Sequence, residues 1–217
     1  MSFAGSDFYA ALIHELKNSL GLLSMSIEGV PPNGEPAHDG ALDEARLLCQ
    51  GVIDRLNQAL LIYKAANGPI HPMIDACSPH DLVHELAEQT RALARGRLRV
   101  ESAVADEVPV LWFFDRDLVN MALINAVHNA LRYAGSAIRI EAAMRDGFLA
   151  LRVADDSSGY PQHVLDSVAA GTAIRGSGTG LGLQFARLIA QSHDNHGRCG
   201  ALRLSNEGGA AFELLLP

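Results

Sequence analysis

The segment Gly176-Ser-Gly178-Thr-Gly180-Leu-Gly182-Leu183 is the most informative stretch of the sequence. Its glycines lead directly into an apolar helical pattern, so small residues and free backbone amides gather where a helix begins. This arrangement is typical of a phosphate-binding loop. The spacing fits neither a Walker A loop, which needs a lysine and then a serine or threonine after its last glycine, nor the G-x-G-x-x-G pattern. A flexible glycine loop without a ligand stays an alternative on spacing alone.

The residues around this segment alternate between helical and strand patterns. Ser78-Pro79 is typical of a helix start, and Asp146-Gly147 is typical of a hairpin turn between two strands. Helices segregated against a mixed sheet make an α+β fold, and we expect such an α/β sandwich in residues 76–217. The expected helices run through Leu82, Leu86 and Leu93 and over residues 117–134 and 180–192, and the strands over residues 97–104, 110–114, 137–145, 148–154, 201–205 and 211–216.

The first 68 residues carry a heptad pattern in two segments. The prolines and glycines of residues 29–36 separate them, and the second helix is expected to start near Leu42. Two helices of about 20 to 26 residues cannot cover their own apolar stripes, so we expect an antiparallel hairpin that forms a four-helix bundle as a homodimer. The seam residues are Ile13, Leu16, Leu20, Leu23 and Ile27, then Ala45, Cys49, Val52, Leu56, Ala59, Tyr63 and Ala66.

Composition limits the classes of function. A chain of 217 residues fits one domain or two small ones, and a hydrophobic fraction of 48% is enough for a packed core. The net charge of −8 disfavours nucleic acid as a partner. No apolar window of about 18 residues and no basic leader are present, so we expect no membrane insertion and a cytoplasmic location. Cys49, Cys77 and Cys199 are expected to be buried thiols in a reducing compartment.

His14 lies next to the seam of the first helix. At about 100° per residue it points roughly 130° away from the bundle core, so its side chain faces water. A lone exposed histidine is usually an ordinary surface residue. Here Glu15 is adjacent, and Lys17 and Asn18 lie one turn further along the same flank. An imidazole with a carboxylate beside it is a competent nucleophile toward phosphorus.

Two more segments place polar residues in apolar surroundings. Asn125 and Asn129 share one face of a helix, where their amides cost stability unless they bind a group such as Mg²⁺ or phosphate. In the segment Val153-Ala-Asp155-Asp156-Ser-Ser-Gly159-Tyr-Pro161 a strand runs into a turn, where a carboxylate could accept a hydrogen bond from the amino group of adenine. Such turns are common, so this segment is uninformative by itself.

Four segments in this order resemble the H, N, G1 and G2 boxes of bacterial two-component sensor histidine kinases. They are HELKNSL at 14–20, NAVHNALRY at 125–133, VADDSSGYP at 153–161 and GSGTGLGL at 176–183. The resemblance covers nearly the whole chain. It implies a dimerisation and histidine phosphotransfer domain over residues 1–68 and a GHKL or Bergerat-type ATP-binding catalytic domain over residues 76–217. No sensor region is expected, so a signal would arrive through an upstream sensory protein.

The resemblance also implies roles for single residues. His14 would be the phosphoacceptor, Glu15 its acid/base partner, and Asn18 the residue that positions water for dephosphorylating a response regulator. Asn129 would bind Mg²⁺ and Asp155 would recognise adenine. The other residues of the ATP site would be Asn125, Arg132, Tyr133, Gly159, Gly178, Thr179, Gly180, Leu181 and Gly182. The implied function is that of a kinase that phosphorylates its own histidine from ATP with Mg²⁺ and passes the phosphoryl group to a response regulator receiver domain.

The chain departs from the family pattern at several positions. Ser157 stands at a glycine position of the G1 box, and Ser19 replaces the proline that usually follows Asn18. Residues 162–175 hold no phenylalanine-rich F box, so a short lid is expected. The segment His193-Asp-Asn-His196-Gly-Arg-Cys199 replaces a shorter His-Gly-Gly, and we interpret it as a polar loop rather than a zinc site.

Two alternatives stay open. One is a phosphotransfer, phosphatase or scaffold protein with a degenerate ATP-binding domain, which Ser157 favours and the intact Asn129 and glycine segment oppose. The other is a GHKL ATPase unrelated to phosphohistidine, which would require the H-box match to be accidental.

Overall fold

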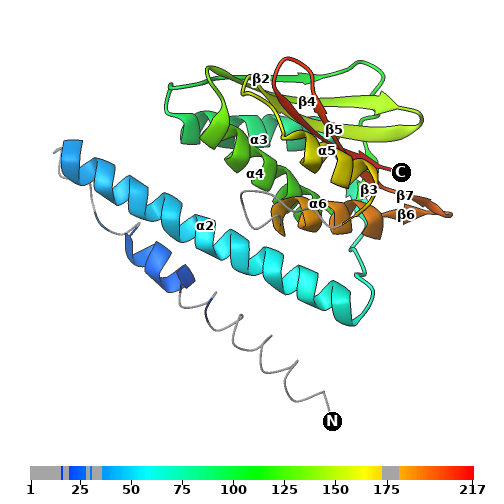
Figure 1. Cartoon of the computed structure of the whole chain (residues 1–217), viewed down its shortest axis with the longest axis horizontal. Coiled ribbons are helices and arrows are strands. Elements are labelled where there is room, and N and C mark those ends of the chain that lie inside the picture. The colour runs from blue at the N-terminus through cyan, green and yellow to red at the C-terminus, as the bar shows by residue number, and fades with distance from the viewer. Residues whose placement is uncertain (1–15, 17–19, 28–29, 31–35, 173–180) are drawn as a thin grey trace, which may run out of the picture. The chain divides into compact units, whose positions relative to one another are not determined.

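The structure is a computed structural model that describes residues 16, 20–27, 30, 36–172 and 181–217. The chain divides into two compact units, Met1–Asn67 and Gly68–Pro217. Figure 1 shows the long helix α2 of the first unit and the layered sheet and helices of the second. Within the described residues, no helix has the length and apolarity needed to cross a membrane.

The first unit contains α2, Pro36–Asn67, and a helical segment at residues 20–27. The Cys49 thiol donates to the Leu20 carbonyl oxygen over 3.3 Å, so this segment packs beside α2. At 32 residues α2 is longer than expected, and the predicted start at Leu42 is wrong. Pro36 accounts for the difference because a proline in the first helical turn sacrifices no hydrogen bond. Apart from Leu16, the rest of the first expected helix, including His14, lies outside the described residues.

The second unit is built on a five-stranded mixed sheet in the order β2-β4-β5-β9-β8. The strand β2 runs parallel to β4, and the other neighbours are antiparallel. The predicted hairpin is confirmed, with a turn at Asp146 and Gly147, whose φ angles of 54° and 75° are those of a two-residue hairpin turn. The strands are β2 Arg99–Val104, β4 Ala137–Arg145, β5 Phe148–Asp155, β8 Ala201–Asn206 and β9 Ala210–Leu216.

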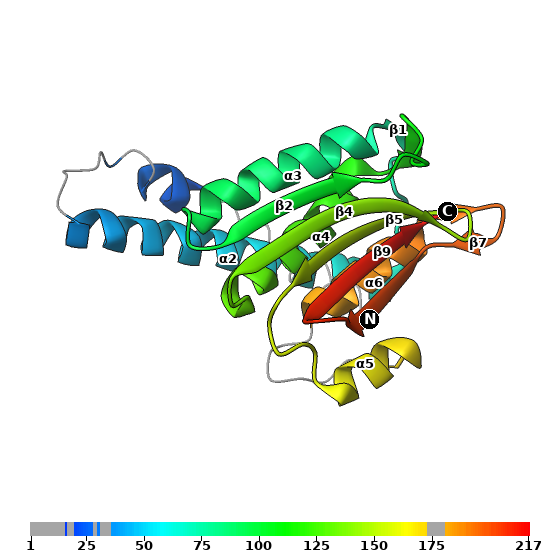
Figure 2. The same ribbon diagram turned by 90° about the horizontal axis from the view of Figure 1, so that it is seen from above.

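Three helices cover one face of this sheet, as Figure 2 shows from the side of the strands. They are α3 Pro79–Ala94, α4 Arg116–Tyr133 and α6 Leu181–Ser192. The start of α3 matches the prediction, because Ser78 Oγ accepts a hydrogen bond from the Asp81 amide at 3.2 Å. Alternate strand residues fill the layer between sheet and helices, including Ile138, Ile140, Leu149, Leu151 and Leu214, each at most 1% exposed.

Several short elements were not expected. The strand β1, Asp75–Cys77, is one of them. It pairs antiparallel, outside the main sheet, with β3, Trp112–Phe114, which lies within the expected strand over residues 110–114. The helix α5, Gln162–Ala169, occupies the first half of the stretch expected to be a short lid, whereas residues 173–180 lie outside the described part. The expected polar loop after α6 is a small hairpin of β6, Asp194–Asn195, and β7, Arg198–Cys199.

The cysteine prediction holds at two of three positions. Cys49 and Cys77 are buried, but Cys199 is exposed, so the expectation of a buried thiol there is wrong. Cys199 lies on the projecting β6–β7 hairpin, where its Sγ lies 3.2 Å from Asp194 Oδ2 instead of packing in the core.

Candidate nucleotide-binding site

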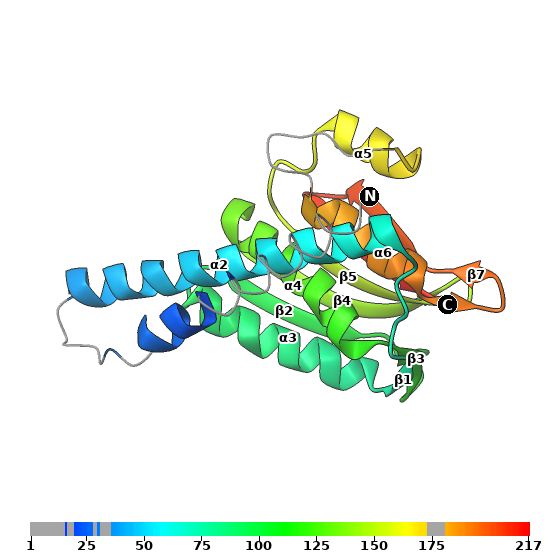
Figure 3. The same ribbon diagram turned by 90° about the horizontal axis from the view of Figure 1, so that it is seen from below.

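The helix α4 carries a polar stripe, Asn125 and Asn129, on a half-buried part of its surface. Six of its apolar residues are buried in the core, whereas these two asparagines are half-buried. Among the described residues, neither amide has a hydrogen-bond partner. Two such amides one turn apart favour a bound polar group, because a partly desolvated amide without a partner costs free energy. Figure 3 shows α4 between α3 and α6 on the helical face of the sheet.

The first turn of α6 lies against Asn125. A Cβ atom built on Gly182 would lie only 2.8 Å from Asn125 Nδ2, closer than a side chain at Gly182 can approach. A side chain at position 182 would therefore displace the Asn125 amide from its present position. The contact brings the start of α6, where backbone amides point out of the helix end, to the polar stripe of α4. Leu181 begins the helix, and Gly178, Thr179 and Gly180 lie outside the described residues.

Asp156 ties the end of α4 to the end of β5. Its carboxylate accepts hydrogen bonds from the amides of Gly135, Ser136 and Ala137 at 2.8, 3.0 and 3.2 Å, and from the Ser136 hydroxyl. The Ser136 hydroxyl and these amides hold the pKa of the Asp156 carboxyl well below its usual range. The clamp fixes where the chain leaves α4 relative to the turn that follows Asp155. Sequence reasoning assigned no role to Asp156.

Asp155 begins this turn and keeps one carboxylate oxygen free. Its Oδ1 accepts from the Ser157 amide at 2.8 Å, and Ser157 Oγ accepts from the Gly159 amide at 3.2 Å. The second oxygen of Asp155 has no hydrogen bond to any described residue. Ser157 does not adopt a positive φ, so its backbone has no need of the glycine found in the family pattern. The substitution thus leaves the turn closed.

Gly159 completes the turn at a φ of 84°, the left-handed region that favours glycine. A Cβ there would lie 2.6 Å from Asn206 Oδ1, so the close approach also excludes a side chain. Burial and the nearby Asp155 charge raise the pKa of the Tyr160 hydroxyl. Asn206 was not predicted: its position before Glu207-Gly-Gly indicates only a turn, and its contact is far away in sequence.

Arg132 and Tyr133 lie at the carboxyl end of α4. The Arg132 guanidinium carbon is 5.4 Å from the centre of the Tyr133 ring, a cation–π contact, and both side chains are exposed. Because Gly135 binds Asp156, this end of α4 lies close to the turn after Asp155. The described candidate residues therefore fall along one helix, between the start of α6 and the end of β5.

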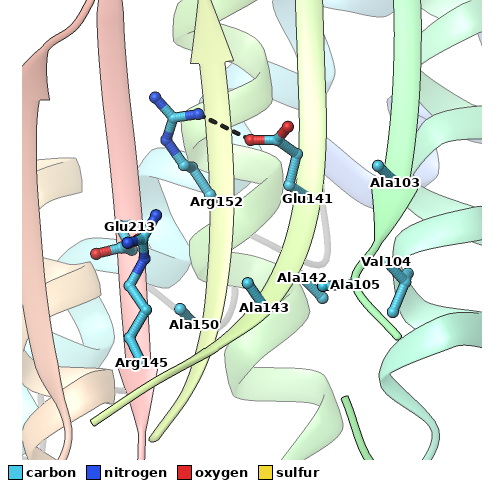
Figure 4. Close-up of a pocket in the computed structure, with 10 residues that line it drawn as sticks. All are labelled: Ala103, Val104, Ala105, Glu141, Ala142, Ala143, Arg145, Ala150, Arg152 and Glu213. Carbon is cyan, nitrogen blue, oxygen red and sulfur yellow. Dashed lines mark hydrogen bonds and ion pairs between the residues drawn. The ribbon is translucent and has the colours of Figure 1, made fainter. Parts of the chain in front are cut away.

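Figure 4 shows a different hollow, of about 280 Å³, on the sheet face that the three helices leave open. Ala103, Ala143 and Ala150 form its apolar part. Arg152 pairs with Glu141 at 2.8 Å, and Arg145 pairs with Glu213 at 2.7 Å. Side chains alternate across a strand, so these residues lie on the opposite face of the sheet from α4 and α6. The hollow is not the candidate nucleotide site.

The segment His193–Cys199 is not arranged as a metal site. His193 is 2% exposed and bonded to Ile189 and Asp115, whereas Cys199 is exposed on the hairpin. In the part of the chain that the structure describes, no three histidine, cysteine, aspartate or glutamate residues are grouped to hold a metal ion.

Comparison with known proteins identifies the class. Residues 114–217 match the family model of the histidine kinase-, DNA gyrase B- and HSP90-like ATPases. That segment contains α4, the turn after Asp155 and α6, the three parts of the candidate site. Residues 114–217 are therefore similar to the ATPase domains of this family.

The curated relatives are histidine kinases. The signal transduction histidine-protein kinase AfsQ2 of Streptomyces coelicolor is 32% identical over 167 residues, which cover 64% of this chain and 30% of AfsQ2. The sensor histidine kinase GtrS of Pseudomonas aeruginosa is 29% identical over 220 residues, 97% of this chain and 41% of GtrS. The chain thus spans less than half the length of these two relatives.

A solved structure shows the same fold. Full-length ShkA, crystallised in complex with AMPPNP, superposes with a TM-score of 0.69 at 21% identity and covers 97% of this chain and 45% of ShkA. The likeness supports the α+β class and the mixed sheet of the second unit. The roles of single residues and the four-helix bundle stay predictions, and His14, Glu15 and Asn18 lie outside the described residues.

Proposed function

We propose that this chain is an ATP-dependent protein histidine kinase of a two-component system. It phosphorylates His14 from ATP with Mg²⁺ and passes the phosphoryl group to an aspartate of a response regulator receiver domain. The observation that carries the proposal is the contact of Gly182 with Asn125, which joins the start of α6 to the polar stripe of α4 inside a domain of the ATPase family.

The residues present fit ATP and Mg²⁺. The amide oxygen of Asn129 is a hard ligand of the kind that Mg²⁺ prefers, and the free oxygen of Asp155 can accept the amino hydrogen of adenine. Asn125 and the amides at Leu181 and Gly182 offer donors to phosphate oxygens. Arg132 and Tyr133 border the same side of α4. When bound, ATP with Mg²⁺ supplies the phosphoryl group and neutralises part of its charge.

The phosphoacceptor chemistry is assigned to the first helix. His14 attacks as a nucleophile through an imidazole nitrogen, and Glu15 orients the ring and takes up its proton. Asn18, one turn further on, holds a water molecule for the reverse task of dephosphorylating the regulator. Positioning supplies most of the rate, since the protein has little covalent chemistry to perform in phosphoryl transfer.

Exposed apolar residues in the first unit support a homodimer through residues 1–68. Leu48 is 64% exposed and Val52 41% exposed on α2, and Leu23 is 50% exposed on the shorter helix. Leu23 and Val52 are seam positions of the heptad pattern, and Leu48 lies beside the seam. A second copy that covers this stripe in a four-helix bundle would bury the apolar area, which favours association. We place the protein in the cytoplasm, with an upstream sensory protein as the source of its signal.

The scaffold alternative loses support at Ser157. A degenerate G1 turn was the feature that favoured it, yet Ser157 closes this turn with its own hydroxyl and keeps an ordinary backbone conformation. The amides of Asn125 and Asn129, which have no hydrogen-bond partner in the part of the chain that the structure describes, also favour a ligand rather than a docking surface.

The deciding experiment is incubation of the purified chain with γ-labelled ATP and Mg²⁺. We expect acid-labile, base-stable label that disappears in His14→Ala, with His84→Ala as the matched control. Absence of label would favour the scaffold, and label that persists in His14→Ala would contradict the assignment of the phosphoacceptor. Asn129→Ala should abolish both labelling and Mg²⁺-dependent ATP binding in calorimetry, while the oligomeric state in light scattering stays that of the wild type.

A further inference from the structure

Asp115 is a buried residue at the start of α4 that forms hydrogen bonds to three segments of the chain. Its side chain is the N-cap of the helix, with Oδ1 accepting from the Leu118 amide at 3.0 Å. Its Oδ2 accepts from the Met73 amide at 2.8 Å, in the segment between the end of α2 and the start of β1. Its own amide donates to His193 Nε2 at 3.0 Å. One residue thus joins the connecting segment, the helix of the two asparagines, and the end of α6.

His193 is the partner that brings α6 into this network. Its ring is 2% exposed, and its Nδ1 lies 2.7 Å from the Ile189 carbonyl oxygen on α6. Because Nε2 accepts from Asp115, the hydrogen is assigned to Nδ1, which donates to Ile189 in the neutral ring. Burial lowers the pKa of His193, while the Ile189 bond and the Asp115 charge oppose that shift. A second proton on Nε2 would face the Asp115 amide and break the contact.

We propose that Asp115 and His193 are positioning residues that fix the position of α4 relative to α6 and link both helices to the connecting segment at Met73. The proposal rests on the proposed function, because the property that the pair controls is nucleotide binding between Asn125 and Gly182. Neither residue contacts that site directly. The pair lies at the amino end of α4 and the carboxyl end of α6, so a shift there moves both helices relative to each other.

The bonds of His193 to Asp115 and Ile189 are buried, and the bonds of Asp115 to Met73 and Leu118 are partly buried, so the loss of one leaves a partly or fully desolvated polar group without that partner. A displacement of the connecting segment at Met73 therefore shifts the Asp115 side chain, which also caps α4. By reciprocity, a nucleotide bound between α4 and α6 should change the protection of the Met73 amide.

Two substitutions of His193 each remove one of its two hydrogen bonds and keep the other. The amide of His193→Asn can reach the place of Nδ1 and keep the Ile189 bond, but it cannot reach the Asp115 amide. The longer His193→Gln can place an oxygen near Nε2 and keep the Asp115 bond, but it has no titratable proton. His84→Asn and His84→Gln, at an exposed position on α3, are matched controls.

The substitution Asp115→Asn separates the two side-chain hydrogen bonds of Asp115, one to Leu118 and one to Met73. An asparagine is as good an N-cap as an aspartate, so the Leu118 bond survives. The second atom becomes an amide nitrogen, which cannot accept from Met73. This variant therefore releases the connecting segment and leaves α4 capped.

The experiment measures binding of AMPPNP with Mg²⁺ by calorimetry and amide hydrogen exchange by mass spectrometry, both on the full chain from pH 5 to pH 8. At pH 7.5 we expect His193→Asn to bind AMPPNP about five- to tenfold more weakly than the wild type and to exchange faster at Asp115, Asn125 and Gly182. We expect the wild type to bind AMPPNP more weakly at acid pH, where a second proton on His193 breaks the contact with Asp115. His193→Gln should stay within about twofold of the wild type at pH 7.5 and should lack this acid weakening. In the wild type, AMPPNP should slow exchange at Met73, and in Asp115→Asn it should not.

Wild-type affinity in His193→Asn, or faster exchange confined to Asp115 and His193, would overturn the proposal. Acid weakening of the same size in His193→Gln would also overturn it. If the wild type itself binds no AMPPNP, the proposed function fails, and the exchange at Asn125 and Gly182 in His193→Asn still decides whether the pair positions the two helices.

Discussion

Asn206 binds both main-chain polar groups of Tyr160 with its side-chain amide. Its Oδ1 accepts from the Tyr160 amide at 2.8 Å, and its Nδ2 donates to the Tyr160 carbonyl oxygen at 2.9 Å. The pair is separated by 46 residues in sequence and joins the end of β8 to the turn after β5. Asp156 holds the other side of that turn against the end of α4. The carboxylate of Asp155 is thus anchored from two directions before any ligand binds.

Replacement of Asn206 by alanine should therefore loosen the turn. Both bonds to Tyr160 would be lost at an exposed position, so we expect the free energy of unfolding to fall by about 1–2 kcal/mol in urea titration. The affinity for ATP should fall as well, because Asp155 loses its preorganised position. Asn195→Ala on the exposed β6–β7 hairpin is the control and should change neither quantity. An unchanged ATP affinity in Asn206→Ala would mean that the turn is not part of the nucleotide site.

A methyl group at Gly182 should interfere with the contact between α6 and Asn125. Gly182→Ala places a Cβ against the Asn125 amide, so we expect an overpacking cost of about 1–3 kcal/mol, seen as weaker ATP binding in calorimetry. Gly51→Ala is the matched control, because this helical glycine has nothing within 4 Å of its built Cβ. That control should be neutral or slightly stabilising. Equal affinity in Gly182→Ala and the wild type would contradict the close packing.

The Asp156 clamp should give the fold a specific acid dependence. The folded-state pKa of Asp156 lies below the ordinary value of 3.8, so the unfolded chain binds more protons in the window below pH 3.8. The stabilisation is fully present above this value and is lost as the pH falls through the folded-state pKa. Asp156→Asn should thus be less stable than the wild type at neutral pH, and the difference should shrink below pH 3.8. Thermal unfolding from pH 3 to pH 7 measures this, and a constant difference would rule out the clamp as its origin.

Kinase and phosphatase functions should separate at Asn18. Asn18→Ala should retain phosphorylation of His14, because the imidazole and Glu15 are untouched. Dephosphorylation of the cognate regulator should slow by on the order of 10²-fold, because the in-line water loses its orienting amide. The heptad pattern predicts an exposed helix flank at this position, where an amide truncation should change the free energy of unfolding by no more than about 0.5 kcal/mol. Equal dephosphorylation rates in the two proteins would refute the role of Asn18.

The sequence by itself determined the elements whose signals are local. The strands β4 and β5 alternate in polarity and meet at Asp146-Gly147, and Ser78-Pro79 marks the start of α3, so both were predicted correctly. The order of the four boxes predicted the family of the second unit. Local signals also have limits: β1 spans three residues and α5 only eight, too short for a periodic pattern to show, whereas β3 lies within the strand expected over residues 110–114. Pro36 was interpreted as part of a break although it begins α2.

Only the tertiary structure decided which distant residues meet. The strand order β2-β4-β5-β9-β8, the bond from Asp115 to His193 across 78 residues and the pairing of Asn206 with Tyr160 depend on how the sheet and helices pack. A side chain in such a contact carries no local mark, since asparagine at a strand end or histidine at a helix end is equally common on the surface. The same packing placed Asn125 against Gly182. Periodicity and capping act over one or two turns, whereas these contacts exist only after the core has brought the elements together.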